Sequence, residues 1–234
     1  MRFWQRFKQN SPVTVSLVTV NVLVFLWMLV RFHLQGISLF SAFSAQSLYQ
    51  AGAMFGPAVR AGQWWRLITP MFIHVTLEHI ALNMVTLYFL GRFVETMFGH
   101  WRTLIIYLVS GVTGNVWSLF FQPQGLSAGA STAIFGLFGA FIALDVLERG
   151  NPVIHQLARQ FALLVVVNLV FDIFAVGIDI WGHIGGLLGG VAVALLLGVP
   201  RAQSRTQSKH AALSLRIIGG VSLVIVNFGL LQLL

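Results

Sequence analysis

Long apolar stretches recur along the whole chain, separated by short segments that contain charges, glycine or proline. Each stretch approaches the 20 or so residues that an α-helix needs to cross the hydrocarbon core of a bilayer. The pattern therefore predicts an all-α integral membrane protein. We expect its spanning helices at 13–30, 77–98, 104–121, 130–147, 157–175, 182–199 and 213–234.

The segments between these helices differ in character. Residues 31–73 are rich in aromatic side chains and too apolar for a solvated loop, so we expect them to lie partly in the membrane interface. Residues 200–212 form a basic linker before the extra helix at 213–234. With no soluble domain, repeat or low-complexity tract evident, we expect one domain over residues 1–234 with its core at about 11–199.

Composition and charge support a membrane protein. Hydrophobic residues make up 57% of the chain and charged residues 9%, whereas about a quarter is usual in soluble domains. The net charge of +8 comes from basic residues that do not form a nucleic-acid-binding stripe. If the N-terminus is cytoplasmic, most of them lie on the cytoplasmic side, which is the positive-inside pattern of membrane proteins. The inner side then holds Arg2, Arg6, Lys8, Arg102, Arg149, Arg159, Arg201, Arg205 and Lys209, and the outer side holds Arg31, Arg60 and Arg66.

The first apolar run bears on where in the cell we expect the protein. The stretch at 13–30 is too long for the apolar region of a signal peptide, so we expect it to be retained as the first span. We expect a multi-pass protein of the plasma membrane. Because the chain is short and shows no targeting signal, a bacterial inner membrane is the expected site.

The sequence gives little support to metal or thiol chemistry. The chain contains no cysteine, which excludes disulfides, thiolate nucleophiles and cysteine-bound metals. The segment "HVTLEH" superficially resembles a zinc-protease motif, but its two histidines, His74 and His79, are five positions apart and would not share a helix face. We therefore expect no metal and no cofactor.

Three polar residues are predicted to lie at a similar depth in the membrane. If the N-terminus is cytoplasmic, the second, fourth and sixth spans all enter from the outer face. Their first turns contain His79, Ser131 and His183, respectively. Polar groups at this depth are costly in lipid, so these three side chains should face the bundle interior or a water-filled cavity.

Ser131 can be interpreted in two ways. A serine among small residues commonly serves helix packing in membranes. Here Gly129, Ala133, Gly136 and Ala140 share one face of the expected helix, and Ser131 projects from nearly the opposite face. A first-turn serine also has free backbone N–H groups and the positive end of the helix dipole beside it, which suits a nucleophile and its oxyanion.

The other two polar positions fit the second interpretation. Gly186 and Gly190 follow His183 on the same face, which allows a neighbouring helix to approach closely. If that helix carries Ser131, His183 can act as its general base. No carboxylate is placed to orient the histidine, so we expect a dyad rather than a triad. His79 and Asn83 share a face of their helix and form either a packing pair or two oxyanion donors.

These segments together resemble the rhomboid family of intramembrane serine proteases over residues 11–199. "GAST" matches the family's Gly-x-Ser-x, "HIGGLLGG" its His-x-x-Gly-x-x-x-Gly and "HIALN" its His-x-x-x-Asn. "WR" matches the signature of the first outer loop. The resemblance gives Ser131 the role of nucleophile, His183 that of base, and His79, Asn83 and the Ser131 backbone N–H that of oxyanion hole. Supporting positions are Gly129, Phe135, Gly186, Gly190, Trp65, Arg66 and His74, and Glu95 and Gly99 also fit the pattern.

The resemblance implies a six-helix bundle, here with a seventh, C-terminal helix (6+1). It implies cleavage of single-span membrane proteins near the outer face of the bilayer, with no nucleic-acid partner. The chain departs from the family at Thr132, where glycine is common and a branched side chain would narrow the space beside the serine. It also has Phe135 where some members have tyrosine.

Two other classes of function remain open on the sequence. The first is a catalytically silent relative that binds transmembrane clients without cutting them. The second is a small transporter or proton relay that uses His79, Asn83, Asn168, Asp172 and His183. In the plainer alternative, Asn168 and Asp172 satisfy one another near the outer end of their helix.

Overall fold

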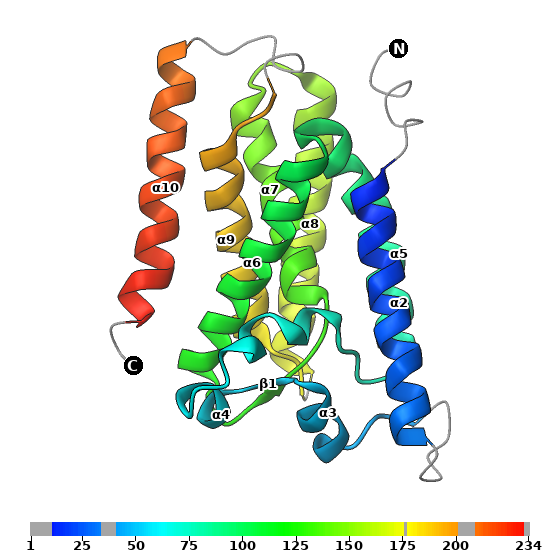
Figure 1. Ribbon diagram of the computed structural model, residues 1–234. Coiled ribbons are helices and arrows are strands. Elements are labelled where there is room, and N and C mark those ends of the chain that lie inside the picture. The colour runs from blue at the N-terminus through cyan, green and yellow to red at the C-terminus, as the bar shows by residue number, and fades with distance from the viewer. Residues whose placement is uncertain (1–10, 34–40, 176, 201–208, 232–234) are drawn as a thin grey trace.

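The chain folds into a bundle of long helices that run alternately up and down (Figure 1). The computed structural model describes residues 11–33, 41–175, 177–200 and 209–231. Within them the long helices are α2 (Pro12–His33), α5 (Leu77–Phe98), α6 (His100–Phe121), α7 (Ser131–Leu147), α8 (Pro152–Phe174), α9 (Ile180–Leu197) and α10 (Lys209–Leu231). The basic residues expected inside at 1–10 and 201–208, and the end of the expected last span at 232–234, lie outside the described residues.

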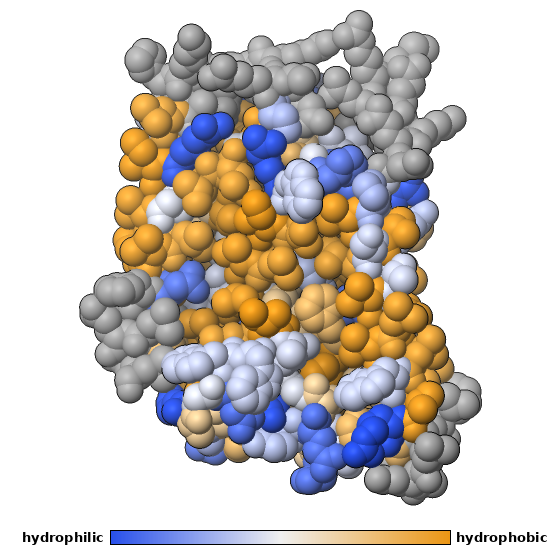
Figure 2. Space-filling model, in the orientation of Figure 1, coloured by the Kyte–Doolittle hydropathy of each residue, from blue (hydrophilic) through white to orange (hydrophobic). Residues whose placement is uncertain are grey.

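The surface of the bundle is that of a multi-pass integral membrane protein. By length and composition, α2, α6, α8 and α9 could each cross a bilayer, while α7 and residues 213–227 of α10 are shorter apolar helices. Figure 2 shows a broad apolar area across the middle of the face in view, with hydrophilic residues gathered toward both ends. Large apolar side chains such as Leu82, Phe171 and Phe174 are exposed on this surface, where lipid would cover them.

α7 is the buried centre of the bundle and packs against α9 almost backbone to backbone. A Cβ atom added to Gly186 would lie 2.1 Å from the carbonyl oxygen of Thr132, and one added to Gly190 would lie 2.0 Å from that of Gly136. Such distances are far below ordinary van der Waals contact, so only glycine fits. The close approach of these two helices is the one that the glycine spacing predicts.

The segment between α2 and α5 is folded, with short elements that the sequence pattern did not predict. They are α3 (Ala45–Ala51), β1 (Met54–Phe55), α4 (Gly56–Arg60) and the 3-10 helices η1 (Trp64–Leu67) and η2 (Thr69–Phe72); β1 pairs antiparallel with β2 (Leu126–Ser127). Arg66 is buried among them, and its Nη1 donates to the carbonyl oxygens of Tyr49 and Ala53 at 2.8 Å each. These bonds hold the segment together beneath the first turns of α5, α7 and α9.

A carboxylate from α5 caps the start of α2. Glu95 accepts hydrogen bonds from the backbone N–H groups of Val13 and Thr14, at 3.0 and 2.8 Å, and from the Thr14 hydroxyl at 2.6 Å. His100 also contacts the same carboxylate. Glu95 therefore satisfies donors that would otherwise be unpaired at the end of an apolar helix.

Candidate active site

The turn before Ser131 requires glycine at position 129. Gly129 has a φ of 143°, and a Cβ atom there would lie 2.8 Å from the His79 imidazole. Backbone conformation and space therefore both exclude a side chain. The prediction that Gly129 belongs to the small face of the helix is wrong, because α7 begins only at Ser131. Gly129 shapes the turn that presents the serine.

His74 fixes the same turn from the side of the outer segment. The side chain is fully buried, and its Nε2 accepts a hydrogen bond from the Ala130 N–H at 3.4 Å. Burial, followed by the neighbouring His79, lowers the pKa of His74 to about 3. His74 is therefore neutral near physiological pH and keeps the acceptor that holds Ala130, the residue next to Ser131.

The first turn of α9 is set by its N-terminal cap. Asp179 accepts a hydrogen bond from the Gly182 N–H at 2.8 Å, and its second oxygen bonds the hydroxyl of Ser118 on α6. An aspartate at this position satisfies a free N–H group and favours the helix dipole. The cap places His183, the next residue after Gly182, at a defined height against α7.

Ser131 and His183 come together across the interface of α7 and α9. His183 Nε2 lies 2.8 Å from Ser131 Oγ, which is within hydrogen-bond range. The imidazole also stacks on the ring of Phe135, with centroids 4.3 Å apart and planes 10° from parallel. The absence of a tyrosine hydroxyl at position 135 thus leaves the stacking intact.

A carboxylate contacts the other nitrogen of the imidazole, so the expectation that none is placed to orient it is wrong. Asp172 Oδ2 lies 2.6 Å from His183 Nδ1, and both side chains are more than 90% buried. Asp172 is in the last turn of α8 and His183 in the first turn of α9, and the antiparallel helices bring these turns side by side. Asn168 does not satisfy Asp172 either, because its amide donates to the Leu164 carbonyl at 2.7 Å.

Donors that could bind an oxyanion lie in the same region as Ser131. Asn83, which is 9% exposed, has an Nδ2 with no hydrogen-bond partner among the described residues. α7 begins without a side-chain cap, so no side chain accepts from its first N–H groups. His79 is held nearby by the Thr76 cap of α5, whose hydroxyl accepts from the His79 N–H at 3.1 Å. These groups can stabilise a developing negative charge.

The polar side chains around Ser131 line one cavity. It has a volume of about 590 Å³ and is lined by His79, Asn83, Ser131, Asp172 and His183 among others. The remaining wall includes apolar side chains of α7 and α8, such as Ile134, Phe138 and Leu164. A hydroxyl within hydrogen-bond range of an imidazole, with unpaired donors around a largely apolar cavity, is the kind of arrangement that acyl transfer requires.

Several positions that the motifs single out lie outside this cavity wall, among them Gly129, His74, Gly186 and Gly190, which support it from behind. Trp65 is half-exposed on the outer segment and Arg66 is buried inside that segment. Thr132 does not narrow the space beside the serine as expected, because its side chain packs against Gly114 of α6. His74 and His79 do meet, with ring centroids 5.1 Å apart, but within the described residues no group of three His, Cys, Asp or Glu side chains could hold a metal.

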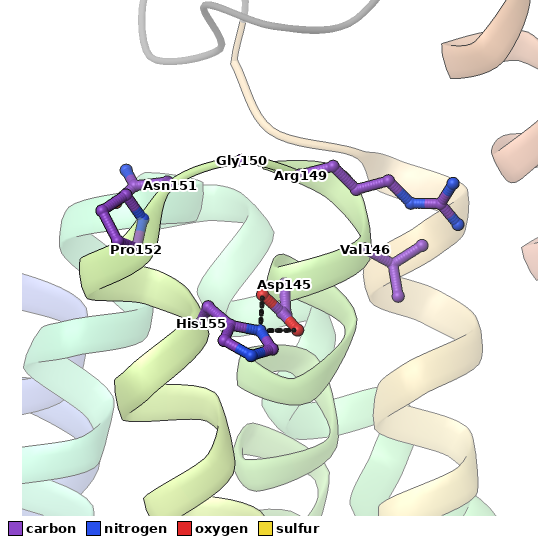
Figure 3. Close-up of a pocket in the computed structure, with 7 residues that line it drawn as sticks. All are labelled: Asp145, Val146, Arg149, Gly150, Asn151, Pro152 and His155. Carbon is purple, nitrogen blue, oxygen red and sulfur yellow. Dashed lines mark hydrogen bonds and ion pairs between the residues drawn. The ribbon is translucent and has the colours of Figure 1, made fainter.

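A second hollow, of about 390 Å³, lies at the far end of α7 and α8 (Figure 3). It contains another His–Asp pair, in which His155 Nδ1 lies 3.0 Å from Asp145 Oδ2. This pair bridges the two helices as Figure 3 shows, but its histidine is exposed and the lining includes no serine, threonine or cysteine. The hollow therefore lacks a nucleophile.

The chain belongs to the rhomboid family, as the resemblance in its motifs indicates. A family model described as "Rhomboid domain" matches residues 61–200. Rhomboid protease GluP of Bacillus subtilis (strain 168) is 36% identical over 188 residues, which cover 80% of this chain and 35% of that protein. Rhomboid-like protease 3 of Toxoplasma gondii is 35% identical over 63% of this chain and 57% of its own length. The putative rhomboid protease YdcA of Bacillus subtilis is 32% identical over 59% of this chain and 69% of its own length. The chain thus spans about a third to just over half of the first two relatives.

Proposed function

We propose that this chain is an intramembrane serine endopeptidase that cleaves transmembrane segments of membrane proteins near the outer face of the bilayer. The observation that supports this most directly is the 2.8 Å contact between Ser131 Oγ and His183 Nε2, formed by two helices inside an apolar cavity. The membership of the rhomboid family, with relatives named as proteases, points the same way. A packing serine would need neither the histidine nor the cavity.

In the proposed reaction His183 Nε2 accepts the hydroxyl proton of Ser131 as Oγ attacks the carbonyl carbon of the scissile bond. The Asn83 amide, His79 and the first N–H groups of α7 stabilise the oxyanion. His183 then passes its proton to the leaving amine. Water, activated by the same imidazole, hydrolyses the acyl-enzyme and returns the hydroxyl to Ser131.

The proposal includes a setting for the chain in the membrane. The seven long helices span the membrane as a 6+1 rhomboid bundle in a single domain over residues 1–234. The N-terminus is cytoplasmic, and the membrane is a plasma membrane, specifically a bacterial inner membrane. The cavity then opens near the outer face, and its apolar wall receives part of a single-span substrate.

A fluorophosphonate probe tests the proposal without a known substrate. An unactivated hydroxyl is almost entirely protonated near neutral pH and does not react, whereas a serine beside a base does. The detergent-solubilised protein should be labelled once, at Ser131. Labelling should fall in acid, because a protonated imidazole cannot accept the proton.

The chain supplies its own controls for this experiment. Ser118 pairs with a carboxylate and Ser110 donates to the Ile106 carbonyl at 2.5 Å, and neither has a histidine partner, so both should remain unlabelled. Ser131→Ala and His183→Ala should abolish labelling and cleavage while the protein stays folded. A folded protein that is unlabelled from pH 6 to 9 would instead favour a silent client-binding relative. Labelling that survives His183→Ala would mean that another group is the base.

A further inference from the structure

We propose that Asp172 is a positioning residue for His183, so that the site works as a Ser–His–Asp triad. This inference rests on the proposed function and adds one residue to it. Its basis is the contact of 2.6 Å between Asp172 Oδ2 and His183 Nδ1, on the side of the ring opposite Ser131. The three side chains come from α7, α8 and α9, so the arrangement is built by the bundle rather than by one local motif.

The carboxylate decides which nitrogen of His183 carries the proton. A carboxylate only accepts hydrogen bonds, so Nδ1 must be the protonated nitrogen in the neutral ring. Nε2 is then left with its lone pair directed at Ser131 Oγ, which is the state that a general base requires. Without Asp172 the imidazole can place the proton on Nε2 or turn about its χ2 axis, and both changes remove the acceptor.

Asp172 also faces the charge that forms during the reaction. When His183 accepts the proton of Ser131, the ring becomes positive although its side chain is more than 90% buried. Among the described residues that line the cavity, the other titratable groups are His79 on α5 and Asp179 at the start of α9. His79 cannot offset a positive charge, and Asp179 is already bonded to Gly182 and Ser118. Asp172 is therefore the carboxylate in contact with the imidazolium.

The proton does not move onto Asp172. It passes from Ser131 Oγ to His183 Nε2 while the bond from Oγ to the carbonyl carbon forms, and then from Nε2 to the leaving amine as the peptide bond breaks. Asp172 remains ionised and holds the Nδ1–H throughout. In deacylation a water proton passes to Nε2 as the water oxygen attacks the acyl carbon, and then from Nε2 to Ser131 Oγ as the ester bond breaks.

A purely structural role for Asp172 predicts different measurements. The residue lies at the end of a helix whose neighbouring side chains, Phe171 and Ile173, are exposed. In that case the bond to His183 would serve only to hold the end of α8 against α9. Loss of that role would lower thermal stability and affect substrate binding, whereas loss of positioning would lower the reactivity of Ser131 in a protein of near-normal stability.

The test compares Asp172→Asn, Asp172→Ala and Asp172→Glu in the full chain. We expect kcat on a model transmembrane substrate, and the fluorophosphonate rate at Ser131, to fall about 10²- to 10⁴-fold in the Asn and Ala variants, as for the corresponding aspartate of soluble serine proteases. KM should stay within about threefold, since Ser131 and His183 do not supply uniform substrate binding. The Glu variant should recover part of the rate.

Asp145→Asn is the matched control, because it removes the carboxylate of a second His–Asp pair in the same bundle, far from Ser131. It should leave the labelling rate unchanged. Formate added to Asp172→Ala should restore labelling, and formamide, which has the same size but no charge, should not.

The outcomes separate the two proposals. Full labelling of Asp172→Asn and Asp172→Ala at the parent rate would overturn the role of Asp172 and leave the Ser–His dyad in place. A variant of Asp172 that loses stability and is not rescued by formate would also overturn it, in favour of a structural bond. Activity that persists in Ser131→Ala would instead remove the proposed function itself.

Discussion

Replacing Gly186 by alanine should disturb the chemistry much more than the fold. Gly186 is one turn below His183 on α9, and its new Cβ atom would lie 2.1 Å from the Thr132 carbonyl oxygen of α7. Ordinary contact begins at about 3.4 Å, so the two helices must separate locally by about 1.3 Å. The carbonyl belongs to the backbone, which cannot rotate away as a flexible side chain could.

The same displacement acts on the hydrogen bond one turn above. A shift of about 1.3 Å applied to the Ser131–His183 distance of 2.8 Å takes it beyond the 3.5 Å limit of a hydrogen bond. Overpacking of this kind costs about 1–3 kcal/mol, and the greater helix propensity of alanine offsets about 1 kcal/mol. A misplacement near 1 Å can cost about 10²-fold in rate. We therefore expect a modest loss of stability and a rate that falls at least about 10²-fold.

The assay combines thermal unfolding in detergent with the fluorophosphonate rate at Ser131. Gly220→Ala provides the control, because its Cβ atom would meet Leu196 of α9 at 3.4 Å, an ordinary contact. This variant should match the parent in both measurements. Labelling of Gly186→Ala at the parent rate would refute the argument, since it would show that α7 and α9 can separate without moving the histidine from the serine.

Three further predictions follow from the site and its supports. Asn83→Ala should lower turnover about 10²- to 10³-fold with little change in thermal stability, because other oxyanion donors remain; a loss of stability with normal turnover would make Asn83 structural only. Truncation after Val199 should lower the melting temperature and leave the labelling rate at Ser131 nearly unchanged, because α10 packs on α9 at Gly219 and none of its described side chains lines the cavity; a stable truncated protein without proteolysis would contradict this. As the pH falls from 6.5 to about 3, His74 takes up a proton in the unfolded state but not in the folded state, where its pKa is lowered to about 3. The free energy of unfolding should therefore fall by at most about 1.4 kcal/mol per pH unit in this range. The His74→Asn variant should lack this contribution, and an identical pH slope in the two proteins would show that His74 is not buried as described.

The long helices could be predicted from the sequence because apolar stretches, together with the residues that begin and end them, indicate their bounds. α5 runs from Leu77 to Phe98, the range expected from the pattern, since Thr76 caps one end and Gly99 ends the other. The short elements between α2 and α5 could not be predicted in this way. They depend on contacts such as those of Arg66 with Tyr49 and Ala53, which no local periodicity encodes.

The candidate site was only partly predictable for a similar reason. Glycines below His183 implied a close neighbour, and the distance to Ser131 agrees with that geometry. Asp172 was missed because the motifs of the family assign it no role and because its position depends on how α8 meets α9. One signal was available: a carboxylate at the end of a spanning helix, 11 residues before the histidine. Such a charge needs a partner in the membrane, and His183 is the first group across the turn that can donate a hydrogen bond to it and carry a positive charge.

The cap that Glu95 provides for α2 has a consequence for biosynthesis. α2 is made before α5, yet the acceptor for its first N–H groups lies 81 to 82 residues later in the chain. Until α5 has been inserted, those donors must bind water or lipid headgroups, and the depth of α2 in the bilayer is not yet set by protein contacts. Once α5 is inserted, the Glu95 carboxylate binds the first N–H groups of α2 and fixes the depth of α2 relative to α5. The final position of α2 therefore depends on a helix that is made after it.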